Sequence, residues 1–208
     1  MFLKAFLAIL FISASLCTKG VDYSTHFSTS QAQCLVNAGY TFAIPRAYCS
    51  PGYVDPNGKA NVANARAGGM KYVDIYMFPC VKCGNPGGQV DTLVNHMSGS
   101  NYGMIWVDVE RYAWYSNLDQ NRNFIRGIVN RLKERGIHFG IYTNRYNWEG
   151  IVGLSWSECA SYPLWYAHYD NNPSFSDFRA FGGWSKPAMK QYAGDKTLCS
   201  GGVDFNCY

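Results

Sequence analysis

Eight short apolar segments rich in β-branched and aromatic residues recur along the chain, and a helical pattern follows each of the first five. The expected strands cover residues 20–24, 42–48, 72–78, 104–110, 139–143, 164–168, 188–192 and 202–206. The expected helices cover residues 30–38, 60–67, 89–97, 117–135 and 148–154. Alternating strands and helices require right-handed crossovers and produce a parallel sheet. The pattern therefore predicts an α/β fold.

The alternation stops after the sixth strand. Residues 170–186 are loop-like, and residues 197–201 are too short for a crossover helix. We therefore predict a single-domain TIM-like barrel, (β/α)5(β)3, with parallel strands and with helices missing from the last part. An open doubly wound sheet is the alternative, but it normally has a glycine-rich phosphate loop after the first strand, where residues 23–27 (YSTHF) stand here. Pro45 predicts a bulge or kink in the second strand, because proline removes a ladder donor.

The N-terminus has the pattern of a signal peptide. Lys4 precedes an apolar run over residues 5–12, and small residues follow over residues 13–17. The run is far shorter than the ~20 residues that span a bilayer. We predict a signal peptide over residues 1–17, with cleavage between 15 and 19, and a barrel domain over residues 18–208. The secretory pathway is the expected route, to the extracellular space or a lysosome- or phagosome-like vesicle, with no membrane anchor.

The eight cysteines fit an oxidising compartment and predict disulfides. The Cys80–Cys83 pair has CxxC spacing, but a zinc ribbon needs a second pair and a redox motif needs a following helix start. A structural disulfide is favoured. Cleavage after Ser15 would keep eight cysteines and cleavage after Cys17 would keep seven. In an all-parallel barrel Cys17 lies below the first strand and Cys207 above the last, so we expect that these two do not pair.

The composition restricts the partners. Only 15% of the residues are charged, the net charge is +4, and no run of Lys and Arg exceeds two residues. Nucleic acid is therefore not an expected partner, and we expect a monomer. Aromatic residues make up 16% of the chain, which suits flat amphipathic ligands such as sugars.

Four acids fall where a barrel enzyme places its reactive residues, at the C-terminal ends of strands. They are Asp22, Asp108, Glu110 and Asp204. Asp108 and Glu110 are two residues apart, so both leave the same face of one strand. Converging carboxylates repel one another and raise the pKa of at least one. A protonated acid beside an ionised carboxylate is the pair that glycosidic bond cleavage requires. Calcium or magnesium at the DxE pair is the weaker alternative, and we expect no metal or cofactor.

Several of these segments, taken together, resemble the lysozymes of glycoside hydrolase family 25 in their small eukaryotic branch. They are residues 20–24 (GVDYS), 107–110 (VDVE), 140–144 (GIYTN), 163–169 (PLWYAHY), 190–192 (KQY) and 203–206 (VDFN). The resemblance implies a (β/α)5(β)3 barrel. It also implies hydrolysis of the β-1,4 bond between N-acetylmuramic acid and N-acetylglucosamine in bacterial peptidoglycan.

The resemblance also implies residue roles. Glu110 is the proton donor, Asp108 orients the N-acetyl group of the substrate, and Asp22 and Asp204 position the substrate and tune Glu110. Whether Asp108 instead attacks directly stays open. The implied substrate contacts are Tyr48, Tyr76, Tyr142, Trp165 and Gln191. Lys190 stands where the family often has an aromatic residue, and Cys49, Cys159 and Cys207 are additional to its pattern.

Two other classes of function stay open at this point. The chain could be a sugar-binding protein without activity, or a hydrolase of another N-acetylhexosamine polymer such as chitin. Peptidoglycan and colloidal chitin as alternative substrates distinguish these possibilities.

Overall fold

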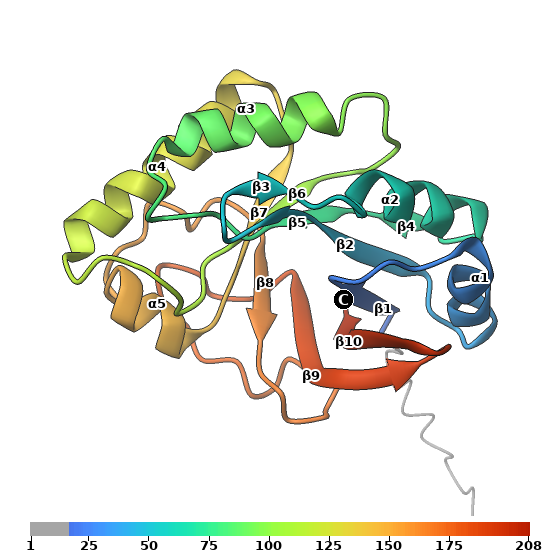
Figure 1. The fold of residues 1–208 in the computed structure, drawn as a ribbon. Coiled ribbons are helices and arrows are strands. Elements are labelled where there is room, and N and C mark those ends of the chain that lie inside the picture. The colour runs from blue at the N-terminus through green and yellow to red at the C-terminus, as the bar shows by residue number, and fades with distance from the viewer. Residues whose placement is uncertain (1–16) are drawn as a thin grey trace, which may run out of the picture.

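The computed structural model describes residues 17–208, and Figure 1 shows their arrangement. The predicted signal peptide therefore lies outside the described residues, except for Cys17. The helices are α1 (Thr29–Asn37), α2 (Gly58–Ala67), α3 (Pro86–His96), α4 (Leu118–Glu134) and α5 (Arg145–Ile151). The strands are β1 (Lys19–Tyr23), β2 (Phe42–Cys49), β3 (Tyr53–Val54), β4 (Tyr72–Val73), β5 (Ile75–Met77), β6 (Ile105–Asp108), β7 (Phe139–Thr143), β8 (Leu164–Ala167), β9 (Met189–Leu198) and β10 (Gly201–Cys207).

The strands close into a barrel. Their order is β1-β10-β9-β8-β7-β6-β5-β2, and pairing of β1 with β2 completes the circle. The short strands β3 and β4 both pair with β2. In the described part of the chain no helix follows α5, so β9 and β10 lack a helical cover (Figure 1). The predicted α/β barrel with helices only in its first part is confirmed.

Helix α4 illustrates why these sequences form helices. Its apolar residues recur at helical spacing and are buried, and the Asn117 side chain accepts hydrogen bonds from the backbone N–H groups of Asp119 and Gln120. Gly136 follows the helix with φ 65°, a left-handed conformation that glycine adopts without steric cost. The sequence therefore specifies both ends of this helix.

The last strand runs in the opposite direction from the one we predicted. β10 is antiparallel to both β9 and β1, whereas β8 and β9 are parallel. The physical reason is the two-residue connection between β9 and β10, in which Cys199 and Ser200 have φ values of 52° and 61°. Two consecutive positive φ values are typical of a type I′ hairpin turn, and a two-residue loop can join only antiparallel strands.

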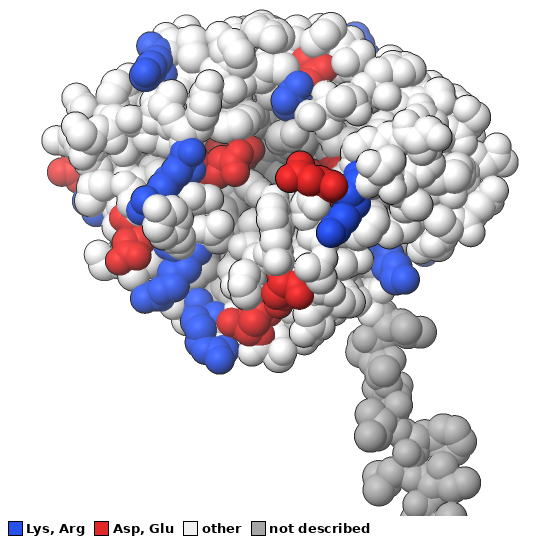
Figure 2. Space-filling view, turned by 60° about the horizontal axis from the view of Figure 1, so that its bottom comes forward, with Lys and Arg blue, Asp and Glu red and all other residues white. Residues whose placement is uncertain are grey.

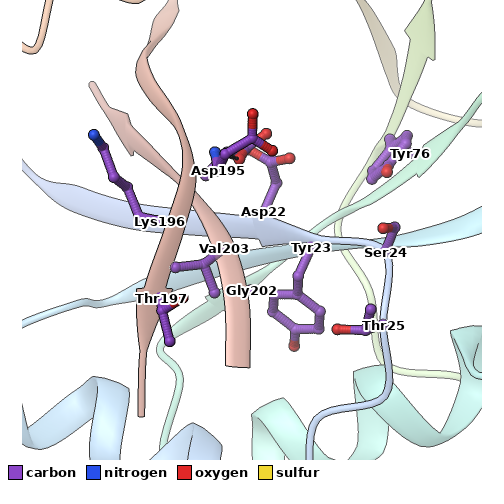
Figure 3. Close-up of a pocket in the computed structure, with 11 residues that line it drawn as sticks. Asp22, Tyr23, Ser24, Thr25, Tyr76, Asp195, Lys196, Thr197, Gly202 and Val203 are labelled. Carbon is purple, nitrogen blue, oxygen red and sulfur yellow. Dashed lines mark hydrogen bonds between the residues drawn. The ribbon is translucent and has the colours of Figure 1, made fainter. Parts of the chain in front are cut away.

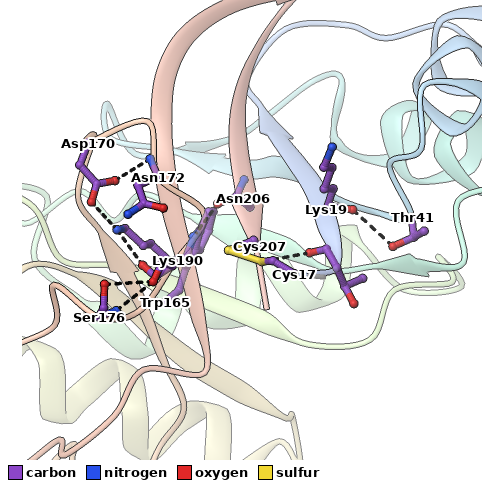
Figure 4. Close-up of a disulfide and its surroundings, with 12 residues drawn as sticks. Cys17, Lys19, Thr41, Trp165, Asp170, Asn172, Ser176, Lys190, Asn206 and Cys207 are labelled. Atoms are coloured by element: carbon purple, nitrogen blue, oxygen red, sulfur yellow. Dashed lines mark hydrogen bonds and ion pairs between the residues drawn. A yellow bond between two sulfur atoms is a disulfide. The ribbon is translucent and has the colours of Figure 1, made fainter. Parts of the chain in front are cut away.

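This reversal also overturns our expectation for Cys17. Because β10 ends at the bottom of the barrel, Cys207 lies beside the start of β1, where it forms a disulfide with Cys17 (Figure 4). Thr18 and Tyr208 extend the same pairing with two backbone hydrogen bonds of 3.0 and 3.2 Å. The expectation that Cys17 and Cys207 stay unpaired was wrong because it assumed an all-parallel barrel.

Two further disulfides are present. Cys80 pairs with Cys83, as the CxxC interpretation predicted, and Cys34 of α1 pairs with Cys199 of the β9–β10 turn. Cys49 and Cys159 are free and buried.

Two of the three apolar clusters in the described residues lie on the two faces of the barrel wall. The outer core lies between the wall and the helices, and the inner core fills the barrel below its mouth. The inner core consists of Phe42, Ile44, Trp106, Tyr142, Trp165, Ala167 and Met189. Within residues 17–208, no helix is both long enough and apolar enough to cross a membrane.

Candidate active site

Asp22 and Asp204 meet where the barrel closes. They are directly paired in the register of β1 and β10. The side-chain amide of Gln191 on β9 donates hydrogen bonds to both carboxylates, at 2.8 Å to Asp22 and 3.1 Å to Asp204. Asn206 donates a further hydrogen bond to Asp22 at 2.7 Å. A pair of amides therefore holds these two acids side by side.

Asp108 and Glu110 approach from β6, on the other side of the barrel. Asp108 ends the strand and is buried, and Glu110 lies two residues further on and is partly exposed. The alternate residues Ile105, Val107 and Val109 face outward into the outer core. Strand alternation therefore directs both carboxyl groups to the cavity, as the spacing predicted.

One cavity of about 100 Å³ at the barrel mouth brings the four acids together. Figure 2 shows Asp and Glu side chains on either side of a hollow in this face. The cavity is lined by Asp22, Tyr76, Asp108, Glu110, Tyr142, Trp165, Tyr169, Gln191 and Asp204. None of these lining residues is His or Cys, so the functional groups of the cavity are carboxyl groups, an amide and aromatic rings.

A second cavity of about 360 Å³ adjoins the first and shares Asp22, Tyr76 and Asp204 with it. Figure 3 shows Asp22 near the middle of this space, with Lys196 and Thr197 on one side and Tyr76, Ser24 and Thr25 on the other. The two cavities together extend from the four acids toward the β9–β10 hairpin.

The environment raises the pKa of all four carboxyl groups. For Glu110 the main cause is burial, and the charge of Asp204 acts in the same direction. Burial and the charges of Glu110 and Asp22 hold the pKa of Asp108 well above its usual range. Burial and the charge of Asp204 also raise the pKa of Asp22, although the hydrogen bonds from Asn206 and Gln191 oppose this shift. Burial and mutual repulsion therefore favour the protonated form of these carboxyl groups.

Asp108 differs from Asp22 in its partners. Asp22 accepts two amide hydrogen bonds, whereas the buried Oδ1 of Asp108 has no partner among the described residues. A buried acceptor without a donor is costly unless a ligand supplies one. The cavity thus contains an acid, Glu110, and a nearby acceptor, Asp108, that suits an N–H group of a bound ligand.

Comparison with known proteins connects this geometry to a family. The family model described as "Lysozyme-like protein 1" matches residues 13–192. A protein named "Probable GH family 25 lysozyme 2" from Dictyostelium discoideum is 47% identical over 99% of this chain and 97% of its own length. The chain belongs to the glycoside hydrolase family 25 lysozymes. "Lysozyme-like protein 5" from Caenorhabditis elegans is 41% identical over 95% of each chain.

The fold of this family 25 lysozyme agrees with solved structures. The bacterial lysozyme from Streptomyces coelicolor superimposes with a TM-score of 0.75 over 91% of this chain and 90% of that chain, at 24% sequence identity. At this identity the match concerns the fold alone. Together with the family membership it establishes the chain as a glycosidase on an α/β barrel, as the resemblance implied.

Most of the predicted site residues of the lysozyme line the cavity, but Tyr48 does not. Tyr76, Tyr142, Trp165 and Gln191 are all in its lining. Tyr48 is 3% exposed and packs in the outer core. The register of β2 against β5 shifts between Arg46 and Tyr48, so a bulge close to Pro45 reverses the alternation and turns Tyr48 outward. The bulge was predicted; its effect on Tyr48 was not.

Two residues of the lysozyme site were missed. Tyr169 lines the cavity and donates a hydrogen bond to Oε1 of Gln191 at 2.9 Å. Asn206 joins Asp22 to Trp165, whose indole N–H donates to Oδ1 of Asn206 at 2.8 Å. Their positions in the sequence could have identified both residues, because Tyr169 lies just beyond the end of β8 and Asn206 lies within β10. Tyr169 follows β8 by two residues, so the strand-end rule that selected Trp165 applies to it as well.

Proposed function

We propose that this lysozyme hydrolyses the β-1,4 bond between N-acetylmuramic acid and N-acetylglucosamine in bacterial peptidoglycan, with Glu110 as the general acid. The observation that carries the proposal is the pairing, in one cavity, of Glu110 with an unpartnered buried oxygen of Asp108. An acid with a raised pKa keeps its proton for the leaving group, and the free acceptor can hold the N–H of an N-acetyl group. The family membership supports peptidoglycan as the substrate.

The proposed reaction has two steps. First, Glu110 gives its proton to the glycosidic oxygen while the bond from that oxygen to the anomeric carbon breaks. The carbonyl oxygen of the N-acetyl group bonds to the same carbon, and Asp108 accepts the N–H hydrogen bond and stabilises the resulting positive charge. Second, water attacks the anomeric carbon, its proton passes to Glu110, and the carbonyl oxygen leaves. Asp22 and Asp204 position the sugar, and burial together with the charge of Asp204 keeps the pKa of Glu110 high.

The aromatic residues supply the sugar contacts in this proposal. Trp165 packs edge-on against Trp106, Tyr142 and Tyr76, with ring centroids 5.8, 4.6 and 6.4 Å away. Rings fixed by this packing present a flat surface at little cost in side-chain entropy. We also propose that the protein enters the secretory pathway and acts outside the cell or in a digestive vesicle. Its three disulfides support this route.

Clearing of a peptidoglycan suspension by the purified protein tests the proposal. Glu110→Gln keeps the size of the side chain but removes the acid, so we expect a loss of at least about a hundredfold in rate. Glu149→Gln, an exposed glutamate on α5, is the matched control and should retain activity. Wild-type-like turnover by a folded Glu110→Gln variant would refute the assignment. Colloidal chitin is the second substrate: cleavage of chitin alone identifies a different polymer, and binding without turnover identifies a sugar-binding protein.

A further inference from the structure

Lys190 is the most unusual buried residue outside the proposed machinery. It follows Met189 at the start of β9, and its side chain is 0% exposed. The ammonium group contacts three oxygens: Asp170 Oδ2 at 2.7 Å, Asp177 Oδ1 at 2.7 Å and the Ser174 carbonyl at 2.9 Å. Figure 4 shows Lys190 and Asp170 on the opposite side of β9 and β10 from the disulfide. All three donor positions of the ammonium are therefore used.

The ion cluster around Lys190 also includes Tyr166 and His168. Asp177 also accepts hydrogen bonds from Tyr166 and from Nδ1 of His168, at 3.1 and 2.6 Å. Burial disfavours the charge of Asp177, but the hydrogen bonds from Lys190, His168 and Tyr166 prevail and lower its pKa to about 2. His168, Asp170 and Asp177 have the composition of a metal site. The ammonium of Lys190 already binds both carboxylates and offsets one of their two negative charges, so the cluster is an ion-pair network.

The network holds residues 168–177, the segment between β8 and the chain that returns to β9. Asp170 immediately follows Tyr169, a residue that is 53% exposed. Tyr169 nevertheless reaches the cavity, where its hydroxyl and that of Tyr142 both donate hydrogen bonds to Oε1 of Gln191, at 2.9 and 2.6 Å. The amide of Gln191 in turn binds Asp22 and Asp204. An unbroken series of contacts thus joins Lys190 to the acids.

Gly194 shows how closely Tyr169 lies on β9. A Cβ atom added at Gly194 would lie 2.8 Å from Cε2 of the Tyr169 ring. The ring therefore rests directly on the strand backbone, and only glycine leaves room for it. Two independent features, the Lys190 ion pairs and the missing side chain at Gly194, determine where the Tyr169 hydroxyl is placed.

We infer that Lys190 is a positioning residue of the active site, which anchors residues 168–177 to β9. The anchored Tyr169 then joins Tyr142 in orienting Gln191 toward the two acids of the barrel seam. The inference rests on the proposed function for its kinetic test and deepens it. Because Lys190 and Gln191 are neighbours on one strand, they face opposite sides of the barrel wall. Lys190 holds the loop on the outer face of the wall. Gln191 contacts the acids on the cavity side.

A double-mutant cycle between Lys190→Met and Tyr169→Phe tests this coupling. Tyr169→Phe removes one hydrogen bond to the site, and we expect roughly a tenfold loss of kcat/KM. Lys190→Met should cause a loss of similar size, and the double variant should lose no more than either single variant. Lys190→Arg, which can still pair with Asp170 and Asp177, should restore most of the activity. Losses that multiply to roughly a hundredfold in the double variant would overturn the proposed path.

Two further variants distinguish a loss of loop positioning from a general loss of stability. Lys190→Met leaves two carboxylates without their cation, so Lys190→Met/Asp170→Asn/Asp177→Asn removes the charges together and should fold even if the single variant does not. Gly194→Ala displaces the Tyr169 ring without touching the ion pairs. It should lower kcat/KM in the wild-type background and have no effect in the Tyr169→Phe background. An equal loss in both backgrounds would show that Gly194 acts by another route.

Hydrogen exchange gives a readout that does not depend on activity. In the unliganded protein, Lys190→Met, or the triple variant, should speed exchange of the amides in residues 169–177 while the amides of β6 and β7 stay protected. Arg126→Met, which breaks the exposed ion pair with Glu158, is the matched control and should leave residues 169–177 unchanged. Unchanged exchange in the Lys190 variants would refute the anchoring role. If instead the wild-type protein fails to cleave peptidoglycan while exchange responds as expected, the proposed function fails and the anchoring role stands.

Discussion

Asp22 and Asp204 are directly paired across the antiparallel junction of β1 and β10, and the amide of Gln191 bridges their carboxylates. The pairing concentrates negative charge at the closing point of the barrel. Because this charge faces Glu110 as well, Asp204 raises the pKa of the proposed general acid. The strand pairing that closes the barrel therefore also places the charge that raises the pKa of Glu110.

Replacing Asp204 with Asn should move the alkaline limb of the pH profile to lower pH. Glu110 is active when protonated, and burial and the charge of Asp204 raise its pKa. Removing that charge lowers the pKa of Glu110, so its proton is lost at a lower pH. The measurement is kcat/KM against pH on a soluble peptidoglycan fragment, with the exposed Asp119→Asn as control. An alkaline limb that stays in place or moves upward would contradict this role of Asp204.

Asp108→Asn should make the fold more stable and the enzyme inactive. The pKa of Asp108 is raised by burial and by Glu110, so its ionised form destabilises the native state. The contribution of Asp108 to the stability of the wild-type protein is greatest below the pKa that Asp108 has in the unfolded chain. This contribution falls as the pH rises through the higher pKa of Asp108 in the folded protein. We therefore expect a gain in the free energy of unfolding at pH 7 that shrinks toward pH 4. Denaturant titrations of both proteins at the two pH values measure it; a gain that is equal at both would exclude the electrostatic explanation.

Gly140→Ala should destabilise the barrel. A Cβ atom at Gly140 would overlap the ring of Trp106 in the inner core and lie 2.8 Å from the Pro163 carbonyl oxygen. Overpacking of this kind costs about 1–3 kcal/mol. Gly202→Ala is the matched control, because its Cβ meets nothing within 4 Å, and should change stability by less than about 0.5 kcal/mol. Thermal unfolding compares the two, and similar melting temperatures would rule out steric conflict at Gly140.

The mature protein should retain Cys17. The Cys17–Cys207 disulfide and the backbone pairing of Thr18 with Tyr208 make Cys17 part of the folded domain. Signal cleavage is therefore expected before Cys17, which leaves all eight cysteines in the chain. Intact mass and non-reducing peptide mapping of the secreted protein check this. A mature chain that begins at Thr18 would contradict it.

Loss of the same disulfide should lower stability. Cys207→Ala releases a cross-link that spans 190 residues, and the expected cost is about 2–5 kcal/mol. Cys49→Ala removes a free buried thiol without opening a cross-link and is the control. Equal unfolding midpoints for the two variants would show that the cross-link contributes little.

The sequence by itself determined the number and order of the main elements. Hydrophobic periodicity is local, so eight strands, five helices and the end of α4 at Gly136 could be predicted from neighbouring residues alone. The same local rule placed Asp108 and Glu110 on one face of β6, because side chains alternate along a strand. Trp165 and Tyr142 were found by their position at strand ends.

Only the tertiary structure decided the direction of β10, the partner of Cys17 and the orientation of Tyr48. Each depends on pairing between strands, where a two-residue turn or a single bulge changes which side chains face inward. The Lys190 network has the same origin: a lysine on β9 meets Asp170 and Asp177 only because the chain folds back against the strand. Local patterns specify which elements form, and long-range pairing specifies which of their side chains meet.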